Sequence, residues 1–235
     1  SSVVWTCTGN PAQVHTTLDT AARVLASRAT PASLEDWQPI LSIYRAMGAI
    51  TWTEALLARS ELAGRPELQE AATWAHQMRV RYGATAGAAD PADEGALVAT
   101  VKAVLDQVNT DQFKAAGAAL ATADKRWPRA AGLATMRCEL EFRQQHLGPA
   151  RKACSQALAL APTTSWALYL LGVMDLQGNQ AARTLGIMRL RAAIAADPDL
   201  GQAWRTLGKA LGRYGTAEEL AQLRADHQAR FGRAL

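Results

Sequence analysis

The spacing of prolines and small residues constrains the fold more than any other feature of this sequence. Pro128, Pro162 and Pro198 follow one another at intervals of 34 and then 36 residues, and each closes an alanine-rich segment. Small residues stand five and twelve positions before each proline, and these are Ala123, Ala157, Ala193, Ala116, Ala150 and Gly186. A fixed period of this length is the signature of a repeat protein, in which each unit is one supersecondary element.

Apolar residues recur with a helical period along nearly the whole chain. Alanine, the strongest helix former, is abundant, and the β-branched residues and turn clusters are not spaced as strands require. The sequence therefore predicts an all-α chain. We expect helices at 11–28, 34–47, 51–63, 67–82, 95–109, 112–126, 130–145, 148–160, 165–177, 182–196, 201–213 and 216–232.

One segment interrupts the helical pattern. Residues 84–94 are small and acidic and carry no large apolar side chain, which is typical of a linker or a flexible loop. The chain is thereby divided into an N-terminal helical region, 1–83, and a second region, 95–235. The final predicted helix, 216–232, is rich in charged and amide residues, as a capping helix with a solvated outer face would be.

The clearest motif is WRTLGKALGRYG, which begins at Trp204 and ends at Gly215. It resembles the tetratricopeptide repeat, whose pattern is W-x2-L-G-x2-Y, then A-x3-F, then P over about 34 residues. The matching residues are Trp204, Leu207, Gly208 and Leu211 here; Leu168, Leu171 and Gly172 one unit earlier; Phe113, Ala116 and Ala123 before Pro128; and Trp37, Ile40, Leu41, Tyr44 and Gly48 before Pro66.

The resemblance covers 95–235 and, in degenerate form, 34–67. It implies a right-handed α-solenoid of antiparallel helix pairs whose stacked units share one core, with degenerate hairpins of the same kind in 1–83. Two features depart from the family pattern. Arg137 and Cys138 stand where a large apolar and a small residue are expected, and the unit at 163–198 has two extra residues in its inter-helix turn.

The resemblance also implies a binding surface, because the first helix of each unit lines a concave groove that takes peptides or helices. Three stripes map to this groove: Trp166, Tyr169 and Val173; Arg205, Lys209 and Arg213; and, as an extension, Phe142 with Arg143. A cationic and aromatic groove suits an acidic, partly apolar peptide. The alternative is a solvated basic face beside a capping aromatic pair. The Lys/Asn clamp of the chaperone-tail receptors in this family is absent.

Two of the three cysteines fall on one predicted hairpin. In the resembled fold Cys138 and Cys154 face each other across the helix pair, within reach of a disulfide. The alternative is a pair of reduced thiols that fill a tight helix contact. A disulfide would indicate an extracytoplasmic, periplasmic setting, and reduced thiols a cytoplasmic one. Cys7 is then unpaired, or marks the start of the fold near a removed anchor.

The sequence shows no signature of a catalytic or metal site. The four histidines, His15, His76, His146 and His227, are dispersed, and we expect them at the surface or at helix ends. HExxH, GxSxG, P-loop and dinucleotide-binding motifs do not occur. Three scattered cysteines do not make a zinc site. We therefore expect no enzyme, no cofactor and no metal.

Charge and hydropathy limit the partners. The 25 basic and 21 acidic residues give a formal net charge of +4, which permits an anionic partner without requiring one. The longest apolar run, 166–174, is far shorter than the roughly 20 residues of a membrane-spanning helix. The chain begins at Ser1 without Met or a signal peptide, so we expect a processed or excised piece of a longer protein.

The leading interpretation is a protein–protein interaction scaffold that holds a segment of a partner in the concave groove. The second is a sensory or regulatory domain, extracytoplasmic if the disulfide forms, of a larger bacterial membrane protein such as a kinase. Nucleic-acid binding would need aligned basic residues over several units, and only one unit has such a stripe.

Overall fold

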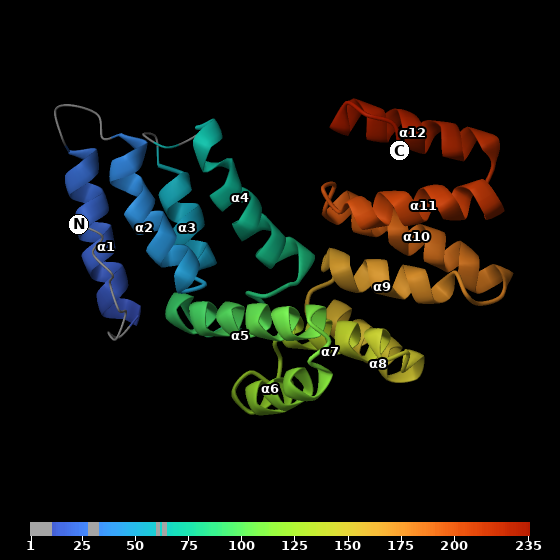
Figure 1. The fold of residues 1–235 in the computed structure, drawn as a ribbon, viewed down its shortest axis with the longest axis horizontal. Coiled ribbons are helices and arrows are strands. Elements are labelled where there is room, and N and C mark those ends of the chain that lie inside the picture. The colour runs from blue at the N-terminus through green and yellow to red at the C-terminus, as the bar shows by residue number, and fades with distance from the viewer. Residues whose placement is uncertain (1–10, 28–32, 60–61, 63–64) are drawn as a thin grey trace. The chain divides into compact units, whose positions relative to one another are not determined.

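The computed structural model describes residues 11–27, 33–59, 62 and 65–235, and every regular element in these ranges is a helix (Figure 1). The prediction of an all-α chain is confirmed. The chain forms two compact units, which we describe separately. Unit 1 contains residues 1–75 and 88–99, and unit 2 contains residues 76–87 and 100–235. Cys7 lies outside the described residues.

Unit 1 is built from the first helices of the chain. These are α1 (Pro11–Ala26), α2 (Leu34–Ala46), α3 (Ile50–Leu57), a 3₁₀ turn (Pro66–Leu68), α4 (Gln69–His76) and the first half of α5 (Pro91–Asn109). A capping box of Ser33 and Asp36 starts α2, as its sequence indicates. The buried side chains of Trp37, Leu41 and Tyr44 pack with α1 in one core. Unit 1 therefore holds together through apolar packing of short helices.

The segment expected to be a linker differs in the structure. Residues 91–94 form the first turn of α5, where Pro91 begins the helix and Asp93 and Glu94 occupy its acidic first turn. The buried Glu94 carboxylate accepts hydrogen bonds of 2.7 Å each from the backbone N–H and the hydroxyl of Thr51. This contact fixes the beginning of α5 within unit 1.

Unit 2 continues with consecutive helices that agree with the predicted ranges to within a few residues. They are α6 (Phe113–Arg126), α7 (Ala131–Arg143), α8 (Leu147–Leu160), α9 (Ser165–Asp175), α10 (Gln180–Ala196), α11 (Gly201–Tyr214) and α12 (Ala217–Phe231). Each helix packs against the next, and α7 also packs against α9. Figure 1 shows α9, α10, α11 and α12 lying side by side.

Helices α9 and α10 approach closely because two glycines face each other. A Cβ atom on Gly186 would lie 2.9 Å from the Gly172 carbonyl oxygen, and one on Gly172 would lie 2.9 Å from Leu190 Cγ. Beside this contact, the buried Asp175 of α9 accepts from Arg151 of α8 and from Arg189 of α10. The small residues at these positions are therefore required by backbone proximity.

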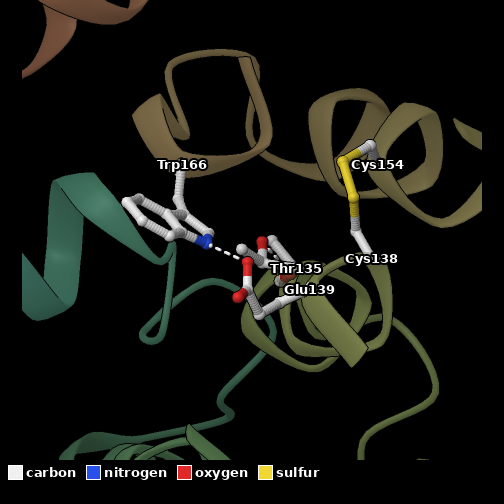
Figure 2. Close-up of a disulfide and its surroundings, with 6 residues drawn as sticks. Thr135, Cys138, Glu139, Cys154 and Trp166 are labelled. Atoms are coloured by element: carbon white, nitrogen blue, oxygen red, sulfur yellow. Dashed lines mark hydrogen bonds between the residues drawn. A yellow bond between two sulfur atoms is a disulfide. The ribbon is translucent and has the colours of Figure 1, made fainter. Parts of the chain in front are cut away.

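Helices α7 and α8 are joined covalently. A disulfide links Cys138 to Cys154, with Cα atoms 5.1 Å apart, and both residues are fully buried (Figure 2). The surrounding core contains the small residues Ala134, Ala150 and Ala157. Cys138 thus occupies the position that Gly172 holds 34 residues later, and Cys154 occupies the position that Leu190 holds 36 residues later.

The contact of α11 with α12 is looser than expected from the motif. A Cβ on Gly208 would lie 3.8 Å from Leu223 of α12, which is ordinary van der Waals distance, but 2.8 Å from Leu235 Cδ2. Gly208 therefore makes room chiefly for the side chain of Leu235, and α12 itself leaves space for a methyl group.

We predict that Gly186→Ala destabilises the protein by about 1–3 kcal/mol, because its methyl group would press against the backbone of α9. Gly212→Ala is the matched control, since a Cβ there would meet only Leu220 Cδ2 at 3.8 Å. We expect this control to gain about 0.5–1 kcal/mol from helix propensity. Urea unfolding followed by circular dichroism measures both, and equal stability of the two variants would contradict the close contact.

Loss of the disulfide has a predictable size. The cysteines are 16 residues apart, and closing a loop of this length in the unfolded chain is worth about 3 kcal/mol. We expect oxidised wild type to exceed Cys138→Ala/Cys154→Ala in unfolding free energy by roughly that amount. Dithiothreitol should lower the stability of the wild type and leave the double variant unchanged. No response of the wild type to reductant would argue against the bond.

Candidate partner-binding surfaces

The segment 76–87 lies directly on α7 and α9 within unit 2. The N–H of Ala131 donates to the Ala86 carbonyl at 3.1 Å, and a Cβ on Gly132 would lie 2.8 Å from the Cα of Ala84. Gly83 has a φ of +62°, and a Cβ there would lie 2.8 Å from the hydroxyl oxygen of Thr164. Glycines on both sides thus allow backbone to pack on backbone.

Trp166 on α9 faces this segment. Its indole N–H donates to the Glu139 carboxylate of α7 at 2.9 Å, and Figure 2 shows the ring pointing from α9 toward Glu139. The indole centroid lies 6.0 Å from the Tyr82 ring and 5.1 Å from the Tyr169 ring. Trp166 and Tyr169 are half-buried. The aromatic stripe therefore packs largely against the protein's own side chains.

Glu139 is a buried carboxyl group that forms no ion pair with any residue the structure describes. Burial raises its pKa above the usual glutamate range, while the indole N–H of Trp166 and the more distant charge of Arg143 act in the opposite direction. Thr135, one helical turn earlier, donates its hydroxyl to the Ala131 carbonyl. The hydrogen bond from the Trp166 indole N–H therefore holds the Glu139 carboxyl group in place.

The segment 76–87 is also held by charge. The guanidinium Nε of Arg81 donates to the fully buried Asp197 at 2.8 Å, and His76 Nε2 lies 3.8 Å from the same carboxylate. The N–H of Asp199 donates to Asp197 as well, at 3.1 Å. Asp197 stands in the turn between α10 and α11, so this turn and the segment 76–87 share one anchoring carboxylate.

The cationic stripe of α11 has different surroundings. Arg205 and Lys209 are exposed and, with Arg224 of α12, line a cavity of 330 Å³ whose other lining residues are Gly208, Leu220 and Leu235. Within the described ranges, these three cations form no ion pair. The third residue of the stripe, Arg213, is exposed and lies 5.5 Å from the ring of Tyr214.

The remaining residues predicted for the groove lie outside both the surroundings of Trp166 and the cavity lined by Arg205, Lys209 and Arg224. Phe142 is half-buried against the core of α7, α8 and α9, and Val173 is half-buried on α9. Arg143 is exposed and pairs with Asp111 at 3.1 Å. Across the described part of unit 2, no hydrogen bond, ion pair or ring contact links the stripe Trp166–Tyr169–Val173 to the stripe Arg205–Lys209–Arg213.

Sequence reasoning did not identify Glu139, Tyr82, Arg81, Asp197, Arg224 or Leu235. The repeat period itself contained a signal for Glu139, because Glu139, Val173 and Lys209 follow one another at 34 and 36 residues. Such equivalent positions fall on the same side of each first helix. No comparable signal marks Tyr82 or Arg81, which lie outside the periodic region.

The histidines differ in part from expectation. His227 is buried rather than at the surface: its ring lies edge-on to Trp204 with centroids 5.5 Å apart, and its Nδ1 lies 3.0 Å from the Arg233 carbonyl oxygen. His15 stacks on Trp52 at 3.9 Å. In the portion of the chain that the structure describes, no group of three or more His, Cys, Asp or Glu side chains could hold a metal ion.

Comparisons with known proteins give no family. No family model matches the sequence, and no curated protein matches it either. Among the described helices, none combines the length and the apolar character needed to cross a membrane.

Replacement of Glu139 tests whether its carboxyl group titrates in the buried site beside Trp166. Because the pKa of Glu139 is raised in the folded state, the unfolded chain loses this proton first, and stability falls as pH rises above the usual glutamate range. In Glu139→Gln the amide oxygen still accepts from Trp166 and no charge develops. We expect this variant to have a flatter stability profile and to exceed wild type at neutral pH.

Urea midpoints between pH 4 and pH 8 measure this difference. Glu70→Gln is the control, because the Glu70 side chain is 81% exposed and it should keep the wild-type profile. A Glu139→Gln profile that runs parallel to that of the wild type would show that Glu139 does not titrate in a buried site.

Proposed function

We propose that this protein is a non-enzymatic interaction scaffold of the tetratricopeptide-repeat type, which binds an acidic, partly apolar segment of a partner protein. The solenoid of antiparallel helix pairs is part of this proposal. It is supported by consecutive packing of α6 to α12 and by small residues at the α7–α8 and α9–α10 contacts. The recurrence of these residues at nearly constant intervals supports it further.

The observation that carries the binding proposal is the cationic rim on α11 and α12. Arg205, Lys209 and Arg224 converge on one cavity that also presents the apolar side chains of Leu220 and Leu235. Converging like charges that have no ion-pair partner among the described residues raise the local positive potential, which attracts carboxylates and repels basic chains. The apolar lining adds a preference for an aliphatic or aromatic side chain beside those carboxylates.

The aromatic stripe has a different role in this proposal. Because Trp166 already donates to Glu139 and packs near Tyr82, we assign it to holding the segment 76–87 on α7 and α9. The partner surface is then narrower than the sequence alone suggests. It centres on Arg205 and Lys209 rather than on Trp166 and Tyr169.

Fluorescence anisotropy with a labelled peptide, Ser-Glu-Asp-Leu-Glu-Asp-Ser, tests this assignment. We expect Arg205→Glu/Lys209→Glu to weaken binding at least about ten-fold, because two attractive charges become repulsive. The control is Lys125→Glu/Lys152→Glu, which reverses two exposed cations on α6 and α8 and changes net charge by the same amount. Equal weakening by both variants would indicate unspecific charge attraction and contradict the proposed surface.

A second function is favoured by the disulfide. A buried Cys138–Cys154 bond is typical of an oxidising compartment, which fits an extracytoplasmic regulatory domain of a larger bacterial protein such as a kinase. Thiol alkylation before lysis of the source cells, followed by non-reducing peptide mapping, tests this setting. We expect the linked peptide, and alkylated Cys138 and Cys154 would favour the cytoplasmic alternative.

A further inference from the structure

The residues after α12 fold back onto α11. Gly232 ends α12 with a left-handed φ of +65°, the usual C-terminal reversal of a helix. The carbonyl oxygen of Arg233 then accepts from Nδ1 of the buried His227 at 3.0 Å. Together these contacts return the chain toward α11 and place Leu235 against the core cluster of Trp204, Leu207 and Leu223.

Leu235 fills a space that only glycine leaves open on α11. Its Cδ2 would lie 2.8 Å from a Cβ on Gly208, so an alanine there would already press against this side chain. We call this space beside Gly208 the Gly208 socket. It adjoins the 330 Å³ cavity that Leu235 itself lines together with Gly208, Leu220, Arg205, Lys209 and Arg224. Its apolar floor accepts a leucine side chain, and its rim is cationic.

The tail, residues 232–235, matches the apolar floor of the socket but not its cationic rim. Residues 232–235 read Gly-Arg-Ala-Leu, which supply one aliphatic side chain, one further cation and no acidic side chain. The rim already holds three cations that form no ion pair in the described structure. An occupant that carries both a leucine-like side chain and flanking carboxylates would complement floor and rim together.

We propose that the Gly208 socket recognises an aliphatic side chain flanked by acidic residues in a partner protein, and that Leu235 occupies the socket as an internal competitor. This rests on the proposed function and adds to it the residue that the partner inserts and the way access is limited. Because a partner binds only when Leu235 has left, the apparent affinity is reduced by the fraction of molecules with an open socket.

The test compares wild type with Leu235→Ser and with a variant that lacks residues 232–235. Each is titrated with the peptide Ser-Glu-Asp-Leu-Glu-Asp-Ser and with its analogue in which serine replaces the leucine. We expect both variants to bind the leucine peptide about ten-fold tighter than wild type. The serine analogue should bind weakly and equally to all three proteins. Circular dichroism establishes that each variant keeps its helical content.

The outcomes separate this inference from the proposed function. Equal affinity of Leu235→Ser and wild type for the leucine peptide, with binding still lost in Arg205→Glu/Lys209→Glu, would overturn the competitor role and leave the acidic-segment scaffold intact. If Leu235→Ser gained the same affinity for the leucine peptide and for the serine peptide, recognition of the aliphatic side chain would be overturned. The acidic-segment scaffold would again remain intact. Absence of any binding that depends on Arg205 and Lys209 would overturn both proposals.

Discussion

The backbone contact between α9 and α10 sets the geometry on which the rest of unit 2 depends. With Gly172 and Gly186 facing each other, the two helices approach closely enough for Leu190 to pack at the crossing. Asp175 then reaches Arg151 and Arg189 on the helices to either side. In the preceding pair, the Cys138–Cys154 disulfide holds the corresponding contact. These close contacts position α7, α8, α9 and α10 relative to one another within unit 2.

The predicted binding residues of α9 and of α11 differ in exposure: those of α9 are half-buried, and those of α11 are exposed. On α9, Trp166 packs near Tyr82 of the segment 76–87, and the Arg81–Asp197 pair holds this segment to the turn between α10 and α11. On α11, Arg205 and Lys209 remain exposed and line a cavity whose wall includes Leu235, which packs against Gly208. The aromatic stripe on α9 thus serves internal packing, and the cationic stripe on α11 serves the proposed partner recognition.

The helices and their bounds were largely predictable because amphipathic period, small residues and turn residues all act locally. Gly172 and Gly186 could also be predicted, since the repeat period marks positions where helices touch. The covering of Trp166 could not, because Tyr82 and Arg81 lie in a non-periodic segment whose partners are distant in sequence. Gly208 matches the glycine of the repeat motif, but the neighbour that needs this space is Leu235 rather than α12. The eight residues expected in one groove lie in separate surroundings in the structure. The sequence could not predict this, because no pattern in it indicates where the segment 76–87 or residues 232–235 pack.

Methyl NMR of leucine-labelled protein tests the central claim most directly. The claim is that the α11–α12 surface binds an acidic segment and releases Leu235 as it does so. On titration with the acidic leucine peptide, we expect the Leu235 methyl resonances to move to the shifts of a solvated chain and those of Leu220 to change. Leu185, which is 42% exposed on α10, should stay unperturbed. Unchanged Leu235 and Leu220 resonances at saturating peptide, or perturbation centred on another helix, would contradict the account.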